Sequence, residues 1–358
     1  MNEPRTIAAH SDVTARGEPL CLIEIGSRGV RMLVAALEDG DLRPITRRYD
    51  STVGLAEVLG MESRELAGRV KQIRTIVKAY VLEAVQQHGV SLGRTWVFGT
   101  EAVRMLRKRS PEVFELLHEG LHVHDTFALL ARRPPPIVPF VVLGVKYEAY
   151  YALTTAVRSL PSLVRPGDSV LAIDQGSGSV ELAVGRLEET GLTHSAYKAY
   201  PLGTRRLTAE LRAVGGDCDR LYDWVMAHVD ARPLRGSKPT THTIVLGSAI
   251  TMLGRIAARR RSGRRLADRY DPAEVHGLSL TMEDLARQIH DHHWGSELNQ
   301  RDIAAGEFDT VLAGLVGLRA LLVRHAKTEF VVCGEALRFG VAWDLASTLS
   351  SSKASSTR

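Results

Sequence analysis

The chain has 358 residues, which is too long for one ordinary hydrophobic core and suits two domains of average size. Hydrophobic residues make up 44% and charged residues 24%, as in globular proteins, and the net charge of +5 permits a polyanionic ligand without requiring one. Three widely spaced cysteines without a C-x-x-C pair argue against a disulfide framework and a zinc module. With no signal peptide and no apolar window of about eighteen residues, we expect a cytoplasmic protein that does not enter a membrane.

The first half of the chain predicts strands and helices in alternation, after a polar segment over residues 1–18 that we expect to be disordered. Apolar residues at helical spacing predict a long amphipathic helix over 62–88. The predicted strands cover 21–25, 31–37, 42–49, 95–98 and 137–143, and further helices begin near Thr100 and at Lys146.

The second half repeats this order of elements. Strands over 169–174 and 180–185 enclose a Gly/Ser turn, as the strands over 21–25 and 31–37 do in the first half. Such an internal duplication predicts two similar α/β domains whose turns face each other across a cleft. The remaining predicted elements are strands over 194–200, 242–246 and 329–333, and helices over 218–230, 247–260, 310–325 and 336–347.

The turn over residues 176–179 carries the chemistry that the residues themselves suggest. Gly176 and Gly178 permit positive φ angles, and a turn of this kind can direct several N–H groups at one anion. Asp174 ends the preceding strand, where its carboxylate could hold a divalent cation against a phosphate, and Glu181 lies in the returning strand. Taken alone, a Gly/Ser turn more often makes only a hairpin.

Nine segments in order resemble the exopolyphosphatase/guanosine pentaphosphate phosphohydrolase (Ppx/GppA) family, within the actin, sugar-kinase and chaperone-ATPase superfamily. They are I-E-I-G-S-R-G-V-R (23–31), F-G-T-E-A-V-R (98–104), L-G-V-K-Y-E-A (143–149), I-D-Q-G-S-G-S-V-E-L (173–182), P-L-G-T-R-R-L-T (201–208), V-L-G-S-A (245–249), V-H-G-L-S-L-T-M-E-D-L (275–285), F-D-T-V-L-A-G (308–314) and A-L-R-F-G (336–340). The resemblance implies an α/β fold of two ribonuclease H-like (actin-like ATPase) domains, 19–142 and 143–340, with a central interdomain cleft. A terminal helix over 341–349, which packs on the first domain, and a disordered tail over 350–358 would complete a short family member.

The resemblance also implies a set of site residues. Glu148 matches the family's catalytic glutamate and would orient and deprotonate the attacking water. Asp174, Glu24 and Glu181 match acids associated with Mg²⁺. The implied phosphate-binding residues are Gly26, Ser27, Arg28, Arg104, Gly176, Ser177, Gly178, Ser179, Gly247 and Ser248.

Four places depart from the family pattern. Glu24 replaces an aspartate and Arg28 adds a cation in the first turn, while Tyr147 replaces the glutamate before Glu148. The family's Gly-Gly-Thr is Gly247-Ser248-Ala249, and its Ser-Asp is Cys333-Gly334. The leading hypothesis is a Mg²⁺-dependent phosphohydrolase that removes a terminal phosphate from polyphosphate or a phosphorylated nucleotide such as guanosine pentaphosphate. The alternatives are a catalytically impaired sensor that binds such ligands, and a family member recruited to a different phosphorylated metabolite.

Other charged clusters are weaker candidates. Two histidine groups, 122–124 and 290–293, lack further metal ligands nearby in sequence, so we interpret both as structural. The arginine run over 259–265 has no interleaved aromatic residues, and we do not expect it to bind nucleic acid. The expected partner is therefore polyphosphate or a phosphorylated nucleotide, and a homodimer is left open.

Overall fold

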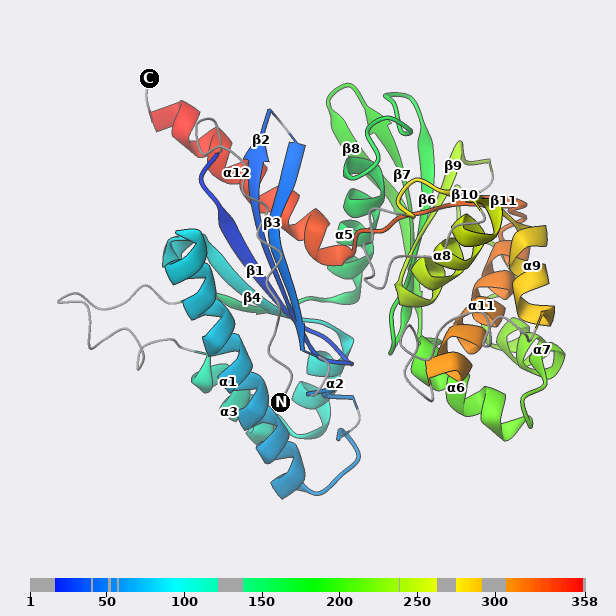
Figure 1. Ribbon diagram of the computed structural model, residues 1–358, viewed down its shortest axis with the longest axis horizontal. Coiled ribbons are helices and arrows are strands. Elements are labelled where there is room, and N and C mark those ends of the chain that lie inside the picture. The colour runs from blue at the N-terminus through cyan, green and yellow to red at the C-terminus, as the bar shows by residue number, and fades with distance from the viewer. Residues whose placement is uncertain are drawn as a thin grey trace. The chain divides into compact units, whose positions relative to one another are not determined.

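The computed structural model describes residues 17–39, 41–50, 53–56, 58–121, 138–237, 239–262, 275–291 and 307–356 (Figure 1). The chain forms two compact units. One contains the residues up to Gly144 together with those from Val341, and the other is Val145–Gly340. The first histidine group, the last residues of the second and the end of the arginine run lie outside the described residues.

The first unit is built on a five-stranded sheet in the order β3-β2-β1-β4-β5. Three strands form an antiparallel meander, and the last two run parallel to β1. The strands are β1 (Leu20–Ile25), β2 (Val30–Glu38), β3 (Asp41–Asp50), β4 (Thr95–Gly99) and β5 (Phe140–Val142).

Helix α1 (Ser63–His88) buries its apolar stripe against alternate residues of this sheet, such as Ile23 and Met32. It ends at Gly89, whose left-handed φ of 65° lets Val90 N–H bond back to Ala84. The unit also contains the short 3₁₀ helix η1 (Leu92–Arg94), α2 (Glu101–Arg109) and α3 (Pro111–Gly120).

The second unit has a six-stranded sheet in the order β10-β11-β9-β6-β7-β8. Helix α5 (Val145–Arg158) covers one face, where Ala149 and Leu153 pack with Ala172 and Ala183 (Figure 1). The other helices of the unit supply the core on the opposite face. The strands are β6 (Ser169–Gln175), β7 (Val180–Glu188), β8 (Gly191–Tyr200), β9 (His242–Leu246), β10 (Ser279–Thr281) and β11 (Glu329–Val332). The helices of that opposite face are α6 (Thr204–Ala213), α7 (Cys218–His228), α8 (Ser248–Ser262), α9 (Met282–His290) and α11 (Glu307–Arg324).

The predicted duplication is confirmed by strand order. The order β3-β2-β1-β4-β5 in the first sheet corresponds to β8-β7-β6-β9-β11 in the second. Both second strands also carry an irregularity at the same place, between Val34 and Ala35 and between Val184 and Gly185. The α/β fold class is therefore as predicted, whereas the cleft between the domains stays a prediction.

Several elements differ from the sequence prediction. Helices α3 and α6 were not predicted, although Pro111 at the first helical position of α3 is a recognised start signal. Helix α12 (Leu337–Ser356) continues past residue 349, into the segment expected to be disordered. Among the described residues, no helix is long and apolar enough to cross a membrane.

Candidate active site

The turn over residues 176–179 is held rigidly by the start of α6. Three consecutive N–H groups donate to three turn carbonyls: Gly203 to Gly178 at 3.2 Å, Thr204 to Gly176 at 3.0 Å and Arg205 to Ser177 at 3.0 Å. A Cβ atom on Gly203 would lie 2.3 Å from the Gly178 carbonyl carbon, so only glycine permits this approach. The motif over 201–208 is therefore the support of the turn.

The turn also presents a hydroxyl group. The Ser177 Oγ is buried and has no hydrogen-bond partner among the described residues. A buried hydroxyl of this kind costs free energy unless a ligand or water satisfies it. It is therefore a natural contact for a phosphate oxygen.

Two carboxylates face each other directly beside this turn. Asp174 on β6 pairs with Glu181 on β7, and both lie on the sheet face that α5 covers. Glu181 is buried and accepts a 2.5 Å hydrogen bond from the Ser179 hydroxyl. Because like charges opposite each other destabilise a strand pair, this arrangement favours a bound cation.

The third predicted turn lies next to the second. Strand β9 runs parallel to β6 with Leu246 beside Asp174, so the following Gly247 reaches the end of β6. Gly247 has a φ of 128°, and a Cβ atom there would lie 2.5 Å from the Gln175 carbonyl oxygen. Ser248 begins the 15-residue helix α8 and does not have a positive φ angle, so this position does not require glycine. The N-terminus of α8 also carries the positive end of a helix dipole.

Glu148 lies in the first turn of α5 and is only 3% exposed. A carboxylate is rarely buried to this extent without a function or a partner. The helix stacks on the face of β6 and β7 from which Asp174 and Glu181 project, so all three acids belong to one layer of the second unit.

In the first unit, Arg31 on β2 lies beside the turn over 26–29, and sequence reasoning did not single it out. Arg31 pairs with Glu24 across β1 and β2, and its Nη1 lies 3.4 Å from the Glu24 carboxylate. The guanidinium also stacks 4.7 Å above the ring of Tyr49 on β3. A Cβ atom on Gly26 would lie 2.7 Å from the same Nη1, so this charge lies directly over the turn. Strand alternation, which places residues 24 and 31 on one face, was the available signal.

The other expected residues of this unit have structural contacts. Gly26 N–H donates to Gly29 at 2.9 Å, and the Ser27 hydroxyl lies 3.4 Å from Glu101. Arg28 is half-buried. Arg104 donates to the Leu143 carbonyl at 2.7 Å, which braces the segment leading into α5. The structure therefore supports a positioning contact for Arg104 and does not test the predicted phosphate clamp.

Cys333 and Gly334, which replace the family's Ser-Asp, have structural contacts. Cys333 is buried and Gly334 is half-buried. The Cys333 thiol lies 3.3 Å from the Ser159 hydroxyl, and burial raises its pKa to about 12. A thiol with this pKa stays protonated near neutral pH and is a poor nucleophile. Gly334 N–H donates to His276, whose other ring nitrogen lies 2.7 Å from the Ser159 carbonyl.

The expected residues thus divide between the units. Glu148, Asp174, Glu181, residues 176–179, Gly247 and Ser248 belong to the second, and Glu24, residues 26–28 and Arg104 to the first. No cluster of three or more His, Cys, Asp or Glu suited to a metal occurs among the described residues.

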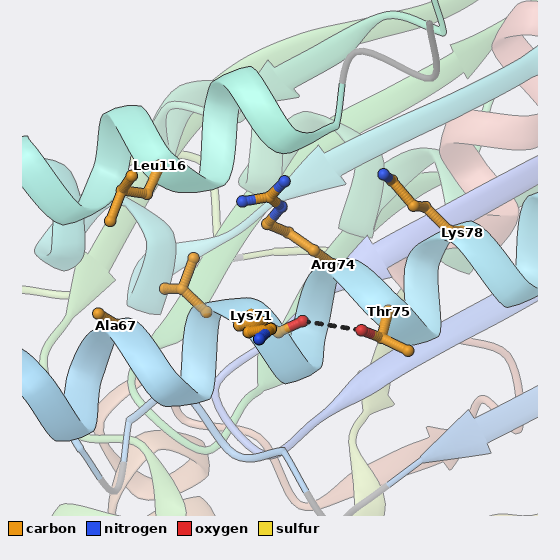
Figure 2. Close-up of a pocket in the computed structure, with 7 residues that line it drawn as sticks. Ala67, Lys71, Arg74, Thr75, Lys78 and Leu116 are labelled. Atoms are coloured by element: carbon orange, nitrogen blue, oxygen red, sulfur yellow. Dashed lines mark hydrogen bonds between the residues drawn. The ribbon is translucent and has the colours of Figure 1, made fainter. Parts of the chain in front are cut away.

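A separate groove of about 390 Å³ lies between α1 and α3 in the first unit and includes no predicted site residue (Figure 2). Lys71, Arg74 and Lys78 line it together with apolar side chains. The charged side chains that line this groove are therefore all cationic.

Comparison with known proteins shows that the chain shares its fold with solved Ppx/GppA structures. No protein-family model and no curated protein matches the chain. The solved structure of a Ppx/GppA enzyme from Aquifex aeolicus is similar over 91% of this chain and 99% of its own, with 21% identity and a TM-score of 0.68. An exopolyphosphatase from Cytophaga hutchinsonii matches over 92% and 98%, with 15% identity and a TM-score of 0.57. At these identities the likeness shows the fold, and it confirms the fold that the sequence motifs implied.

Because Gly203 lies directly against the turn over 176–179, we expect Gly203→Ala to destabilise the fold strongly. The added methyl group would displace the 176–179 turn, and we expect a loss of about 2–3 kcal/mol in the free energy of unfolding. Gly68→Ala is the matched control, because nothing lies within 4 Å of its Cβ position in α1 and alanine should stabilise by about 0.5–1 kcal/mol. Urea unfolding measures both, and equal stabilities of the two variants would contradict the assigned contact.

Proposed function

We propose that the protein is a Mg²⁺-dependent phosphohydrolase that removes the terminal phosphate from polyphosphate or from a phosphorylated nucleotide such as guanosine pentaphosphate. The observation that carries this proposal is the pairing of Asp174 with Glu181 beside a glycine/serine turn. The equivalent pair in the first unit is Glu24 with Arg31. The first repeat therefore places a guanidinium next to its turn, and the second places two carboxylates next to its turn.

The donor set of the second repeat fits Mg²⁺. This ion prefers octahedral oxygen coordination, and it is commonly held by one or two carboxylates while waters and substrate phosphates complete the shell. Asp174 and Glu181 would supply the carboxylates. The bound ion would neutralise negative charge on the phosphate oxygens and so make the terminal phosphorus more open to attack.

The chain's own residues would carry out the remaining steps. Glu148 accepts a proton from a water as the water oxygen attacks the terminal phosphorus. The bond from that phosphorus to the bridging oxygen breaks, and the shortened substrate leaves with the electron pair on that oxygen. The Ser177 hydroxyl and the N–H groups at the start of α8 would bind phosphate oxygens.

The names of similar structures support this reaction class. One is a Ppx/GppA enzyme, one is an exopolyphosphatase, and a structure of nucleoside triphosphate hydrolases from Neospora caninum matches over 92% of this chain with a TM-score of 0.50 and 10% identity. A cytoplasmic location, where such substrates occur, belongs to the same proposal.

A binding protein without turnover is the second candidate. The ion pair of Glu24 with Arg31 favours it, because a carboxylate already paired with a guanidinium is a weaker metal ligand. Tight binding of polyphosphate or guanosine tetraphosphate in calorimetry, with no phosphate released in Mg²⁺, would establish this candidate.

Glu148→Gln should lower kcat by about 10²- to 10⁴-fold while substrate binding is retained, because the amide keeps the shape but cannot accept the proton. Phosphate release and calorimetric binding measure the two effects. Glu189→Gln is the matched control in an exposed turn of the same unit and should leave kcat within twofold. If Glu148→Gln hydrolysed every accepted substrate at the wild-type rate, Glu148 could not be the general base.

Asp174→Asn and Glu181→Gln should each raise the Mg²⁺ concentration for half-maximal activity by at least about tenfold, because each removes one charged ligand. A second readout does not depend on catalysis: Mg²⁺ with a phosphate ligand should raise the Tm of the wild type and much less that of the variants. Glu188→Gln, at the far end of β7, is the control. An unchanged Mg²⁺ response in both variants would contradict the assigned ligands.

A further inference from the structure

Aromatic side chains are concentrated on one face of the second unit. The chain has nine tyrosines, and five of them lie on α5 and β8. Tyr200 on β8 packs into the core on the opposite face of the sheet, which leaves Tyr147, Tyr150, Tyr151 and Tyr197. Helix α5 and strand β8 pack against each other beside β7 (Figure 1). The proposed hydrolysis assigns no task to these rings.

The rings form a continuous series from the helix to the strand. Tyr151 meets Tyr150 edge-on at 5.2 Å between centroids, Tyr150 lies 6.3 Å from His194, and His194 lies 5.8 Å from Tyr197. Packing between α5 and β8 alone would cover these rings. However, Tyr197 is 42% exposed and Tyr147 is 58% exposed, so the series ends on an open aromatic surface.

This aromatic surface is close to the acids of the site. Tyr197 is paired with Ala183, which lies two residues from Glu181 on the same face of β7. Strand geometry then places the Cα atoms of Tyr197 and Glu181 roughly 8 Å apart. Helix α5 contributes both Glu148 and Tyr150, so one helix positions the proposed base and part of the aromatic surface.

His194 has the properties of a neutral stacking ring. Burial, followed by the nearby charge of Lys146, lowers the pKa of His194, so the imidazole is uncharged near pH 7. Its Nε2 has no hydrogen-bond partner among the described residues, which leaves one polar atom unsatisfied beneath the surface. Lys146 itself is exposed in the first turn of α5 and adds a positive charge at this edge.

We propose that Tyr197, His194 and Tyr150, extended by Tyr147, form a stacking subsite for the planar base of a nucleotide whose phosphates reach Asp174 and Glu181. The proposal rests on the proposed function for the placement of the phosphates. Aromatic side chains bind bases because every base has a π-face, which an inorganic phosphate chain lacks. The subsite therefore separates nucleotides from polyphosphate of the same charge.

The test compares GTP with inorganic tripolyphosphate on three proteins: wild type, Tyr197→Leu and Tyr197→Phe. Leucine removes the π-face at a partly exposed position, and phenylalanine keeps it. We expect Tyr197→Leu to lower the ratio of kcat/KM for GTP to that for tripolyphosphate by about tenfold. Tyr197→Phe should keep the ratio within twofold of the wild type, and circular dichroism confirms that each variant is folded.

Calorimetric titration of the same two ligands in the presence of Mg²⁺, on Glu148→Gln and its two double variants, gives a readout without turnover. If the Tyr197→Leu protein loses affinity for GTP and not for tripolyphosphate, the subsite is established. This holds even if the wild type releases no phosphate, a result that would contradict only the proposed function. Equal losses for both ligands, no loss, or no binding of GTP would overturn the subsite. Hydrolysis of tripolyphosphate in that case would leave the proposed function standing.

Discussion

The antiparallel register of β6 and β7 is the constraint on which the candidate site depends. It places Asp174 opposite Glu181, closes the turn over 176–179 between them, and directs both acids to the face under α5. If either strand shifted by one residue, its carboxylate would turn into the apolar core on the other face, at a large cost in free energy. The contact of Gly203 with the turn over 176–179, and the approach of Gly247 to Gln175, hold this end of β6 in place.

The two repeats have the same strand order but differ in the charges beside their turns. In the first, an acid faces a guanidinium that is itself stacked on Tyr49. In the second, an acid faces an acid. The duplicated fold thus places a guanidinium next to one turn and a pair of carboxylates next to the other. The altered Gly247-Ser248-Ala249 turn keeps the one glycine that its backbone requires.

Much of this fold could be predicted from sequence because hydrophobic periodicity and turn glycines are local signals. The strands around both hairpins, helix α1 and the internal duplication follow from them. The role of Arg31 could not be read in the same way, since it depends on cross-strand register and on the close approach to Gly26. Helix α6 was missed for a similar reason: its start is shaped by contact with a distant turn, and Gly203 provides no side-chain cap. The motif resemblance identified Glu148, whose burial only the packing of α5 reveals.

Hydrolysis with a divalent cation at the acids and turn of the second unit can be measured directly. The experiment is phosphate release by the wild-type protein from polyphosphate, guanosine pentaphosphate and common nucleoside triphosphates, with Mg²⁺ and with EDTA. We expect multiple turnovers on at least one of these substrates, lost in EDTA and restored by added Mg²⁺. Tight binding without release of phosphate from any of them, at every Mg²⁺ concentration, would contradict it.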